Sequence, residues 1–232
     1  MGSSEAKAVL PESLELLARG ALELGLDLGP PLLERFGIYL AELRRWNARV
    51  NLTGLKTERE MVIRHFLDGL AVLPFLGEAR EVADIGSGAG FPGLVFKLVR
   101  PEISLTLVES RGKKAAFLEY LITLLHLEGV EVAPVYITPR LARDWGPRFE
   151  VVVSRAALKL KDFLAVAAPI LKPGGRALAL TGPHLPEGEW QRAAAAAPAL
   201  GFDPLERLPY RLPVAGEVRL AVRARKRGSR EG

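Results

Sequence analysis

The sequence predicts an α/β protein with a mostly parallel central sheet, helices on both faces of the sheet and a further helical segment at the N-terminus. After Gly77, short β-branched or leucine-rich runs alternate with helical stretches, the pattern of repeated strand–helix–strand units. The runs 151–153 and 177–180 are almost continuously apolar, as expected for strands that helices cover on both faces. The residues before Gly77 show helical periodicity instead.

Three helices are predicted before the sheet, at 11–26, 31–50 and 57–73. The second has an apolar side opposite a row of arginines and ends near Asn51. Thr57 and Glu60 have the spacing of a capping box, which starts the third helix, and Pro74 ends it. The first third of the chain is therefore predicted to be helical.

The rest of the chain is predicted to alternate between strands and helices. The strands are placed at 81–85, 104–109, 131–135, 149–154, 176–181 and 217–224, with a further candidate at 204–210. The helices are placed at 92–99, 111–128, 137–145, 160–171 and 187–199. Pro173-Gly174-Gly175 has the composition of a turn and is predicted to precede the strand that begins at 176.

These patterns divide the chain into an N-terminal helical extension (1–77) packed on the main domain, the main domain itself (78–226), and a flexible basic tail (227–232). The absence of cysteine excludes disulfides, thiolate metal sites and cysteine nucleophiles, and no metal site is predicted. No apolar run approaches the ~18 residues of a membrane span, and the N-terminus does not resemble a secretory signal. We therefore expect a cytoplasmic protein without a membrane partner.

A glycine-rich segment directly after the first predicted strand carries the clearest functional signal. Gly86, Gly88 and Gly90 alternate with other residues, which allows the backbone to approach a ligand closely. Asp84 lies at the end of the first strand. Glu109 ends the next strand, about 20 positions beyond the first glycine, where a carboxylate can accept hydrogen bonds from ribose hydroxyls. The predicted ligand is a nucleoside.

The glycine-rich segment could bind a dinucleotide or S-adenosyl-L-methionine. Residues 88–93, GAGFPG, also match the G-x-G-x-x-G pattern of dinucleotide-binding proteins. In those proteins the first glycine follows the strand directly, and here Gly86 has that place with the spacing G-x-G-x-G. Asp84 suits the sulfonium and amino group of S-adenosyl-L-methionine better than it suits a phosphate. The prediction is a Rossmann-like class I methyltransferase fold that binds S-adenosyl-L-methionine.

Basic residues cluster in two parts of the chain, although the formal net charge is only +5. Phosphate-binding faces are built from Lys and Arg. The clustering therefore allows a nucleic-acid partner as well as simple solubility. The clusters are Arg44, Arg45, Arg49, Lys56, Arg59 and Arg64, and then Arg219, Arg223, Arg225, Lys226, Arg227 and Arg230.

Several strings in the sequence are more specific than the glycine-rich segment. They are WNARVNLTG at 46–54, RHFLD at 64–68, DIGSGAGFPG at 84–93, LVESRGKK at 107–114 and SRA at 154–156. With these strings, most of the chain resembles the bacterial 16S rRNA guanine-N7 methyltransferases once called glucose-inhibited division protein B. The resemblance implies a methyltransferase that acts on a loop of small-subunit ribosomal RNA, either free or in the 30S subunit. We expect it to act as a monomer.

The predicted site residues combine the motif with this resemblance. The expected cofactor contacts are Asp84, Gly86, Gly88, Gly90, Phe91, Glu109, Ile137, Thr138 and Arg155. The expected RNA contacts are Arg44, Arg45, Arg49, Arg64, Lys113 and Lys114.

Guanine N7 carries a lone pair and no proton, so methyl transfer to it depends on orientation and charge stabilisation more than on a general base. Arg155, His65 and Asn51 are the residues expected to take part. Arg155 follows a buried strand at its carboxyl end, where open α/β sheets bind ligands. His65 either orients the base or is a partly buried histidine bonded to Asp68 or a backbone carbonyl. Asn51 either contacts the RNA or the glycine-rich segment, or caps its helix.

The chain departs from the family pattern at three places. Relatives have Arg-Ala-Glu where this chain has residues 136–138, Tyr-Ile-Thr; they have Lys at Thr181 and Ser at Gly69. Two alternatives therefore stay open: a diverged methyltransferase with another RNA, small-molecule or protein target, and a non-catalytic RNA-binding relative.

Overall fold

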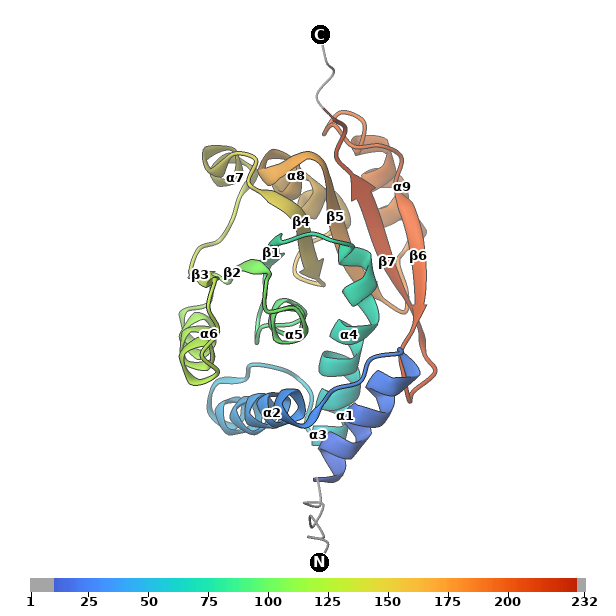
Figure 1. Ribbon diagram of the computed structural model, residues 1–232. Coiled ribbons are helices and arrows are strands. Elements are labelled where there is room, and N and C mark those ends of the chain that lie inside the picture. The colour runs from blue at the N-terminus through green and yellow to red at the C-terminus, as the bar shows by residue number, and fades with distance from the viewer. Residues whose placement is uncertain (1–10, 229–232) are drawn as a thin grey trace, which may run out of the picture.

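Seven strands form a single sheet in the computed structural model, which describes residues 11–228 (Figure 1). The strands are β1 (Glu81–Ile85), β2 (Ser104–Val108), β3 (Val130–Ala133), β4 (Phe149–Arg155), β5 (Leu171–Gly182), β6 (Glu206–Arg211) and β7 (Val218–Arg225). Their order across the sheet is β3-β2-β1-β4-β5-β7-β6. The first five are parallel, and β7 is antiparallel to both of its neighbours. The predicted α/β fold with a mostly parallel sheet is confirmed.

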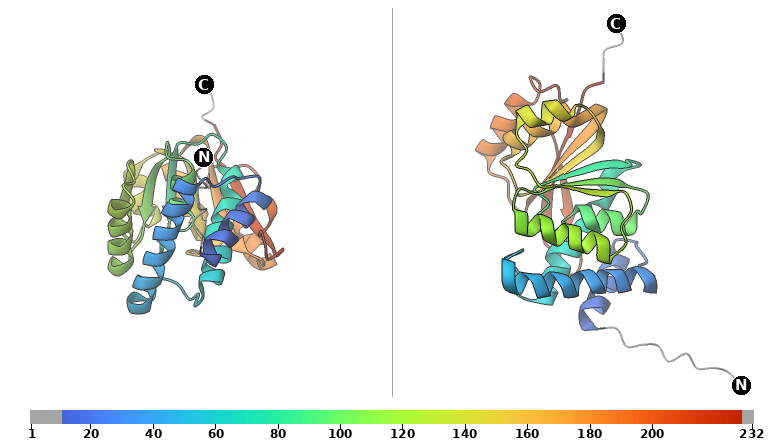
Figure 2. Two further views of the ribbon diagram at one scale, coloured as in Figure 1. Left: turned by 60° about the horizontal axis from the view of Figure 1, so that its bottom comes forward. Right: turned by 90° about the vertical axis from the view of Figure 1, so that its left-hand side faces the viewer.

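Helices cover both faces of the sheet, and the N-terminal helices add an outer layer on one side (Figures 1 and 2). On one face lie α7 (Pro139–Trp145), α8 (Leu160–Ile170) and α9 (Glu187–Ala196). On the other lie α4 (Asp68–Val72), α5 (Gly93–Val99) and α6 (Gly112–Leu124). The outer layer contains α1 (Glu12–Glu23) and α2 (Pro30–Val50), and α2 packs against α5 and α6. None of the helices in this described range is long and apolar enough to cross a membrane.

The predicted helix at 57–73 is confirmed as one helical segment, but it is not a uniform α-helix. The Thr57–Glu60 capping box starts α3 (Glu58–Met61) as expected, but a π-helical turn, η1 (Val62–Leu67), then precedes α4, and a 3-10 turn, η2 (Leu73–Leu76), follows it. A π-turn fits extra residues into the helix and occurs frequently at functional sites. Here it contains both the fully buried Phe66 and His65, which lines a cavity.

The predicted turn at Pro173-Gly174-Gly175 is wrong, because β5 runs through these residues. The strand is irregular there: its register with β4 shifts between Phe149 and Val151, and the Gly174 N–H donates to the Lys226 carbonyl at 3.0 Å. The glycines thus bend a strand that pairing with its neighbours keeps continuous.

The core has two parts, one on each face of the sheet. On the side of α7, α8 and α9 it consists largely of small and aliphatic side chains with Phe163 and Phe202. On the other side, Phe36 and Phe66 of the N-terminal helices share one apolar cluster with Phe91 of the main domain, and the Phe66 and Phe91 rings meet edge to face at 5.1 Å. The first ten residues of the predicted extension and residues 229–232 of the predicted tail lie outside the described residues.

Candidate functional site

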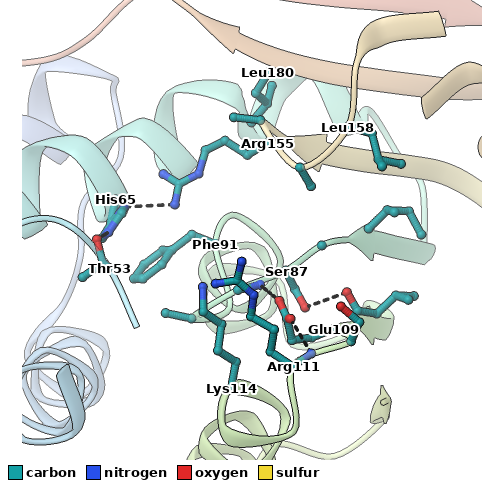
Figure 3. A pocket seen from close by; sticks show the side chains of 18 of the residues that line it. Thr53, His65, Ser87, Phe91, Glu109, Arg111, Lys114, Arg155, Leu158 and Leu180 are labelled. Carbon is teal, nitrogen blue, oxygen red and sulfur yellow. Dashed lines mark hydrogen bonds between the residues drawn. The ribbon is translucent and has the colours of Figure 1, made fainter. Parts of the chain in front are cut away.

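A cavity of about 660 Å³ opens at the carboxyl ends of the parallel strands (Figure 3). Its floor is the loop after β1, and its walls include residues that follow β2, β3 and β4. β1 lies between β2 and β4, where the direction of the chain across the sheet reverses, and open α/β sheets bind their ligands at such a point. One end of the cavity is lined by residues from the loop after α2, from the π-turn and α4, and from β6 and β7: Leu52, Thr53, His65, Asp68, Tyr210 and Arg219.

The three predicted glycines have different roles. All have positive φ, at 71°, 61° and 94° for Gly86, Gly88 and Gly90. Gly88 lines the cavity, and a Cβ there would meet nothing closer than 3.9 Å, whereas a Cβ on Gly86 would lie 2.3 Å from the Ala157 Cβ. Gly86 therefore permits contact with the loop after β4. Gly90 does not line the cavity; its missing side chain leaves room for Leu94 and Tyr39.

Glu109 lies at the end of β2 with its carboxylate on the cavity wall. It is 6% exposed, and its two oxygens accept hydrogen bonds from Gly88 N at 2.9 Å and Arg111 N at 2.8 Å. Each oxygen has a further lone pair that can accept a ribose hydroxyl. Val135 and Ile137, beyond the end of β3, add apolar wall beside it. A carboxylate next to an apolar wall fits the ribose and adenine of a nucleoside.

Asp84 was predicted to contact the cofactor, but it does not line the cavity. Its side chain is fully buried beneath the glycine-rich segment, where Oδ2 accepts a hydrogen bond from Gly93 N at 2.9 Å. Oδ1 has no hydrogen-bond partner among the described residues. Burial raises the pKa of this carboxyl to about 7, against the opposing effects of the Gly93 hydrogen bond and the Arg155 charge. Asp84 can therefore act on a cationic ligand only through its field.

The glycine-rich segment, Glu109 and the apolar wall fit S-adenosyl-L-methionine. Gly88 leaves open the space that a ligand would fill, and the unpartnered oxygen of Asp84 makes a nearby positive charge favourable. The residues that would hold the adenosine part are Gly86, Gly88, Glu109 and Ile137.

Arg155 and His65 meet at the other end of the cavity. The two guanidinium NH groups of Arg155 donate to the Arg64 carbonyl and reach His65 Nδ1, both at 2.9 Å. On its other side His65 Nε2 lies 2.8 Å from Thr53 Oγ1, and the imidazole stacks on Phe91 at 4.4 Å. Burial, with the Arg155 charge, holds the pKa of His65 well below its usual value, so the ring is neutral. The alternative of a bond from His65 to Asp68 is not seen.

Asp68 is a site residue that the sequence did not single out. Its side chain is 1% exposed and accepts a hydrogen bond from the Tyr210 hydroxyl at 2.8 Å. It also forms ion pairs with Arg219 at 3.0 Å and with Arg155 at 3.4 Å. It thus links α4 to β4, β6 and β7. Tyr39 was also missed: its hydroxyl donates to the Ala89 carbonyl at 2.5 Å, which fixes the glycine-rich segment from below.

Two predicted site residues lie away from the cavity. Asn51 is exposed and ends α2 in the left-handed conformation, φ 48°, so it has the capping role rather than a catalytic one. Thr138 caps α7 by accepting a hydrogen bond from Leu141 N at 3.2 Å. By contrast, Asn47 accepts a hydrogen bond from Thr53 N at 2.8 Å and so positions a residue that does line the cavity.

Of the predicted RNA contacts, Lys114 alone lines the cavity. Lys113, the residue before it, is exposed. Arg49 is exposed near the end of α2. The other three have acidic partners: Arg44 pairs with Glu58, Arg45 with Glu42 at 2.5 Å, and Arg64 with Glu217 at 3.7 Å.

The three departures from the family pattern have local explanations. Ile137 lines the cavity while Tyr136 is 69% exposed at its edge. The Thr181 hydroxyl donates to the Leu220 carbonyl of β7 at 2.9 Å. A Cβ on Gly69 would lie 3.0 Å from the Val95 side chain, so glycine permits the close approach of α4 to α5.

Known proteins resemble this chain in sequence and in fold. The profile of the family described as rRNA small subunit methyltransferase G matches residues 32–206. Ribosomal RNA small subunit methyltransferase G of Geobacter sp. (strain M21) is 35% identical over 92% of this chain and 98% of its own length. The protein of that name from Myxococcus xanthus is 39% identical over 90% and 96%. The crystal structure of a putative O-methyltransferase from Klebsiella pneumoniae covers 90% of this chain and 96% of its own with a TM-score of 0.60, and at 15% identity it shows a common fold. The chain therefore belongs to the rRNA small subunit methyltransferase G family of S-adenosyl-L-methionine-dependent methyltransferases.

Proposed function

We propose that the chain methylates N7 of a guanine in a loop of 16S ribosomal RNA of the small subunit. One observation carries the proposal. The strings WNARVNLTG and RHFLD are not part of the general methyltransferase motif, yet Leu52, Thr53, His65 and Asp68 from these strings line the same cavity as the glycine-rich segment. The family-specific residues and the cofactor motif thus build one site.

The charge of the cavity supports an anionic substrate. The cationic side chains on its wall outnumber the carboxylates of Asp68 and Glu109; they are Arg111, Lys114, Arg155 and Arg219. Two further cations, Lys113 on α6 and Arg49 on α2, are exposed, and these two helices are in contact. A nucleic-acid strand that follows α6 and α2 would meet these cations, which can bind its phosphates.

The residues at the site suit methyl transfer to a nitrogen that carries no proton. S-adenosyl-L-methionine, when bound, supplies the methyl group on a sulfonium sulfur. The N7 lone pair can attack without a base, so the protein has to align the base and exclude water. His65 is not placed to remove a proton, because Arg155 occupies Nδ1 and Thr53 faces Nε2. Catalysis by orientation is the mechanism that this arrangement favours.

A methyl-transfer assay tests the proposal. Labelled S-adenosyl-L-methionine is incubated with the protein and, separately, small ribosomal subunits, free 16S rRNA and bulk protein. We expect label in the 16S rRNA of at least one RNA substrate and none in bulk protein. Label only in protein, or in no substrate although the cofactor binds, would contradict the proposal.

A further inference from the structure

The hydrogen bonds around His65 fix which of its nitrogens carries the proton. A guanidinium group can only donate, so Arg155 Nη2, 2.9 Å from His65 Nδ1, requires Nδ1 to be an acceptor. Nδ1 also lies 3.2 Å from the Arg64 carbonyl oxygen, but a proton on Nδ1 would face the N–H of Arg155. Arg155 donates to that carbonyl itself, through Nη1 at 2.9 Å. A neutral His65 therefore carries its proton on Nε2.

This tautomer decides what the Thr53 hydroxyl can do. The Nε2 proton is donated to Thr53 Oγ1 across 2.8 Å. The Leu55 backbone N–H donates to the same oxygen at 3.3 Å. A hydroxyl has two acceptor lone pairs and one donor proton. Both lone pairs are occupied, and the hydroxyl proton has no acceptor among the described residues. Thr53, which lines the cavity, is left as a donor to whatever the cavity binds.

The position of Thr53 indicates which acceptor this is. Figure 3 shows Thr53 and His65 on one side of Phe91 and Glu109 on the other side. Glu109 and the apolar wall mark the nucleoside end of the cofactor site, so the amino-acid end of the cofactor extends toward Thr53 and Arg155. That end carries a carboxylate, and Arg155, with its side chain 21% exposed, supplies a matching positive charge.

From this geometry we infer that the Thr53 hydroxyl, oriented by His65, donates a hydrogen bond to the carboxylate of the cofactor's methionine end. The chain of donors runs from Arg155 through His65 to Thr53 and ends at the ligand. Asn47 supports it by fixing the Thr53 backbone N–H at 2.8 Å. Thr53 is thereby a specificity residue for the carboxylated cofactor, and His65 is a positioning residue. The inference rests on the proposed function only in taking S-adenosyl-L-methionine as the ligand.

Two commercially available adenosine thioethers separate this contact from the rest of the site. S-adenosylhomocysteine has the amino-acid end, and 5′-methylthioadenosine lacks it. Calorimetry measures the affinity of both for the wild type, Thr53→Val and the matched control Thr53→Ser. We expect Thr53→Val to weaken S-adenosylhomocysteine about tenfold to a hundredfold, the range for a hydrogen bond to a charged group. Binding of 5′-methylthioadenosine should change by less than about twofold, and Thr53→Ser should retain the wild-type affinities.

Other outcomes overturn the inference in distinguishable ways. Unchanged S-adenosylhomocysteine affinity in Thr53→Val would show that the hydroxyl does not contact the carboxylate. If that variant also lost methyl transfer to RNA, the acceptor would be the target base instead. Equal weakening of both ligands would indicate a general disturbance of the pocket. A wild type that binds neither ligand would contradict the proposed function itself.

A second measurement tests the role of His65. Long-range ¹⁵N–¹H correlation spectra distinguish the two neutral tautomers, and His65 is one of only three histidines. We expect the Nε2–H form, and the Nδ1–H form would refute the donor chain. His65→Phe should weaken S-adenosylhomocysteine selectively, as Thr53→Val does, and the double variant should be no weaker than Thr53→Val alone. Additive losses would mean that the two residues act independently.

Discussion

The buried carboxyl of Asp84 makes the stability of the cofactor-free protein depend on pH in an unusual direction. In most folded proteins a carboxylate is stabilised by its surroundings and has a lowered pKa. Here burial raises the pKa of Asp84 from 3.8 to about 7, so the folded state holds the proton more tightly than the unfolded chain does. The contribution of protonated Asp84 to the stability of the folded state is complete below the unfolded-state pKa of 3.8 and is lost as the pH rises through about 7.

The size of this effect follows from the two pKa values. The interval from 3.8 to about 7 covers roughly three pH units, and each unit corresponds to about 1.4 kcal/mol. Full ionisation of Asp84 therefore costs the folded state about 4 kcal/mol. Between pH 5 and pH 8 about 2–3 kcal/mol of this should be lost. Asp84→Asn removes the titration and keeps an amide oxygen that can accept from Gly93 N.

Urea denaturation of the wild type and Asp84→Asn at a series of pH values measures the difference. We expect the unfolding free energy of the wild type to fall relative to that of Asp84→Asn by about 2–3 kcal/mol between pH 5 and pH 8. Asp27→Asn, an exposed control, should follow the wild type at every pH. Parallel curves for the wild type and Asp84→Asn would contradict this expectation, because Asp84 would then have the same pKa in the folded and unfolded states.

Three further predictions follow from the site. Asp68→Ala should lower the unfolding free energy by about 3–5 kcal/mol, because the buried Arg219 loses its closest carboxylate; a loss under about 1 kcal/mol in urea would contradict this. Gly88→Val should abolish calorimetric binding of S-adenosylhomocysteine while the left-handed conformation costs only about 1–2 kcal/mol of stability, and wild-type affinity would show that no ligand contacts Gly88. Lys113→Ala should reduce the slope of log affinity for 16S rRNA against log salt by about 1, whereas Arg19→Ala on α1, its control, should leave the slope unchanged in filter binding.

The fold was predictable where local sequence decides it. The Thr57–Glu60 capping box and the apolar strand runs rely on neighbours in the sequence, so both were found. The π-turn at His65 and the continuous β5 across Gly174 were not found, because burial against distant helices and pairing with Lys226 decide them.

The site was predictable for the same reason only in part. Gly88, Glu109 and Arg155 lie at the carboxyl ends of parallel strands or within three residues of them, so topology alone brings them to one edge of the sheet. Asp68 and Arg219 form an ion pair although most of the chain length separates them in the sequence, and no sequence periodicity predicts that contact. Asp84 has the expected place in the sequence, but its side chain turns under the loop to bond Gly93 rather than toward the cavity.

The methylated nucleoside that the protein produces is the strongest test of guanine N7 as the methyl acceptor. Purified protein and S-adenosyl-L-methionine are allowed to react with unmethylated small subunits or their 16S rRNA, which is then digested and analysed by liquid chromatography and mass spectrometry. We expect 7-methylguanosine, formed at one position and only when active protein is present. A methyl group on another base or another atom, or no new methylated nucleoside while S-adenosylhomocysteine binds normally, would contradict this expectation.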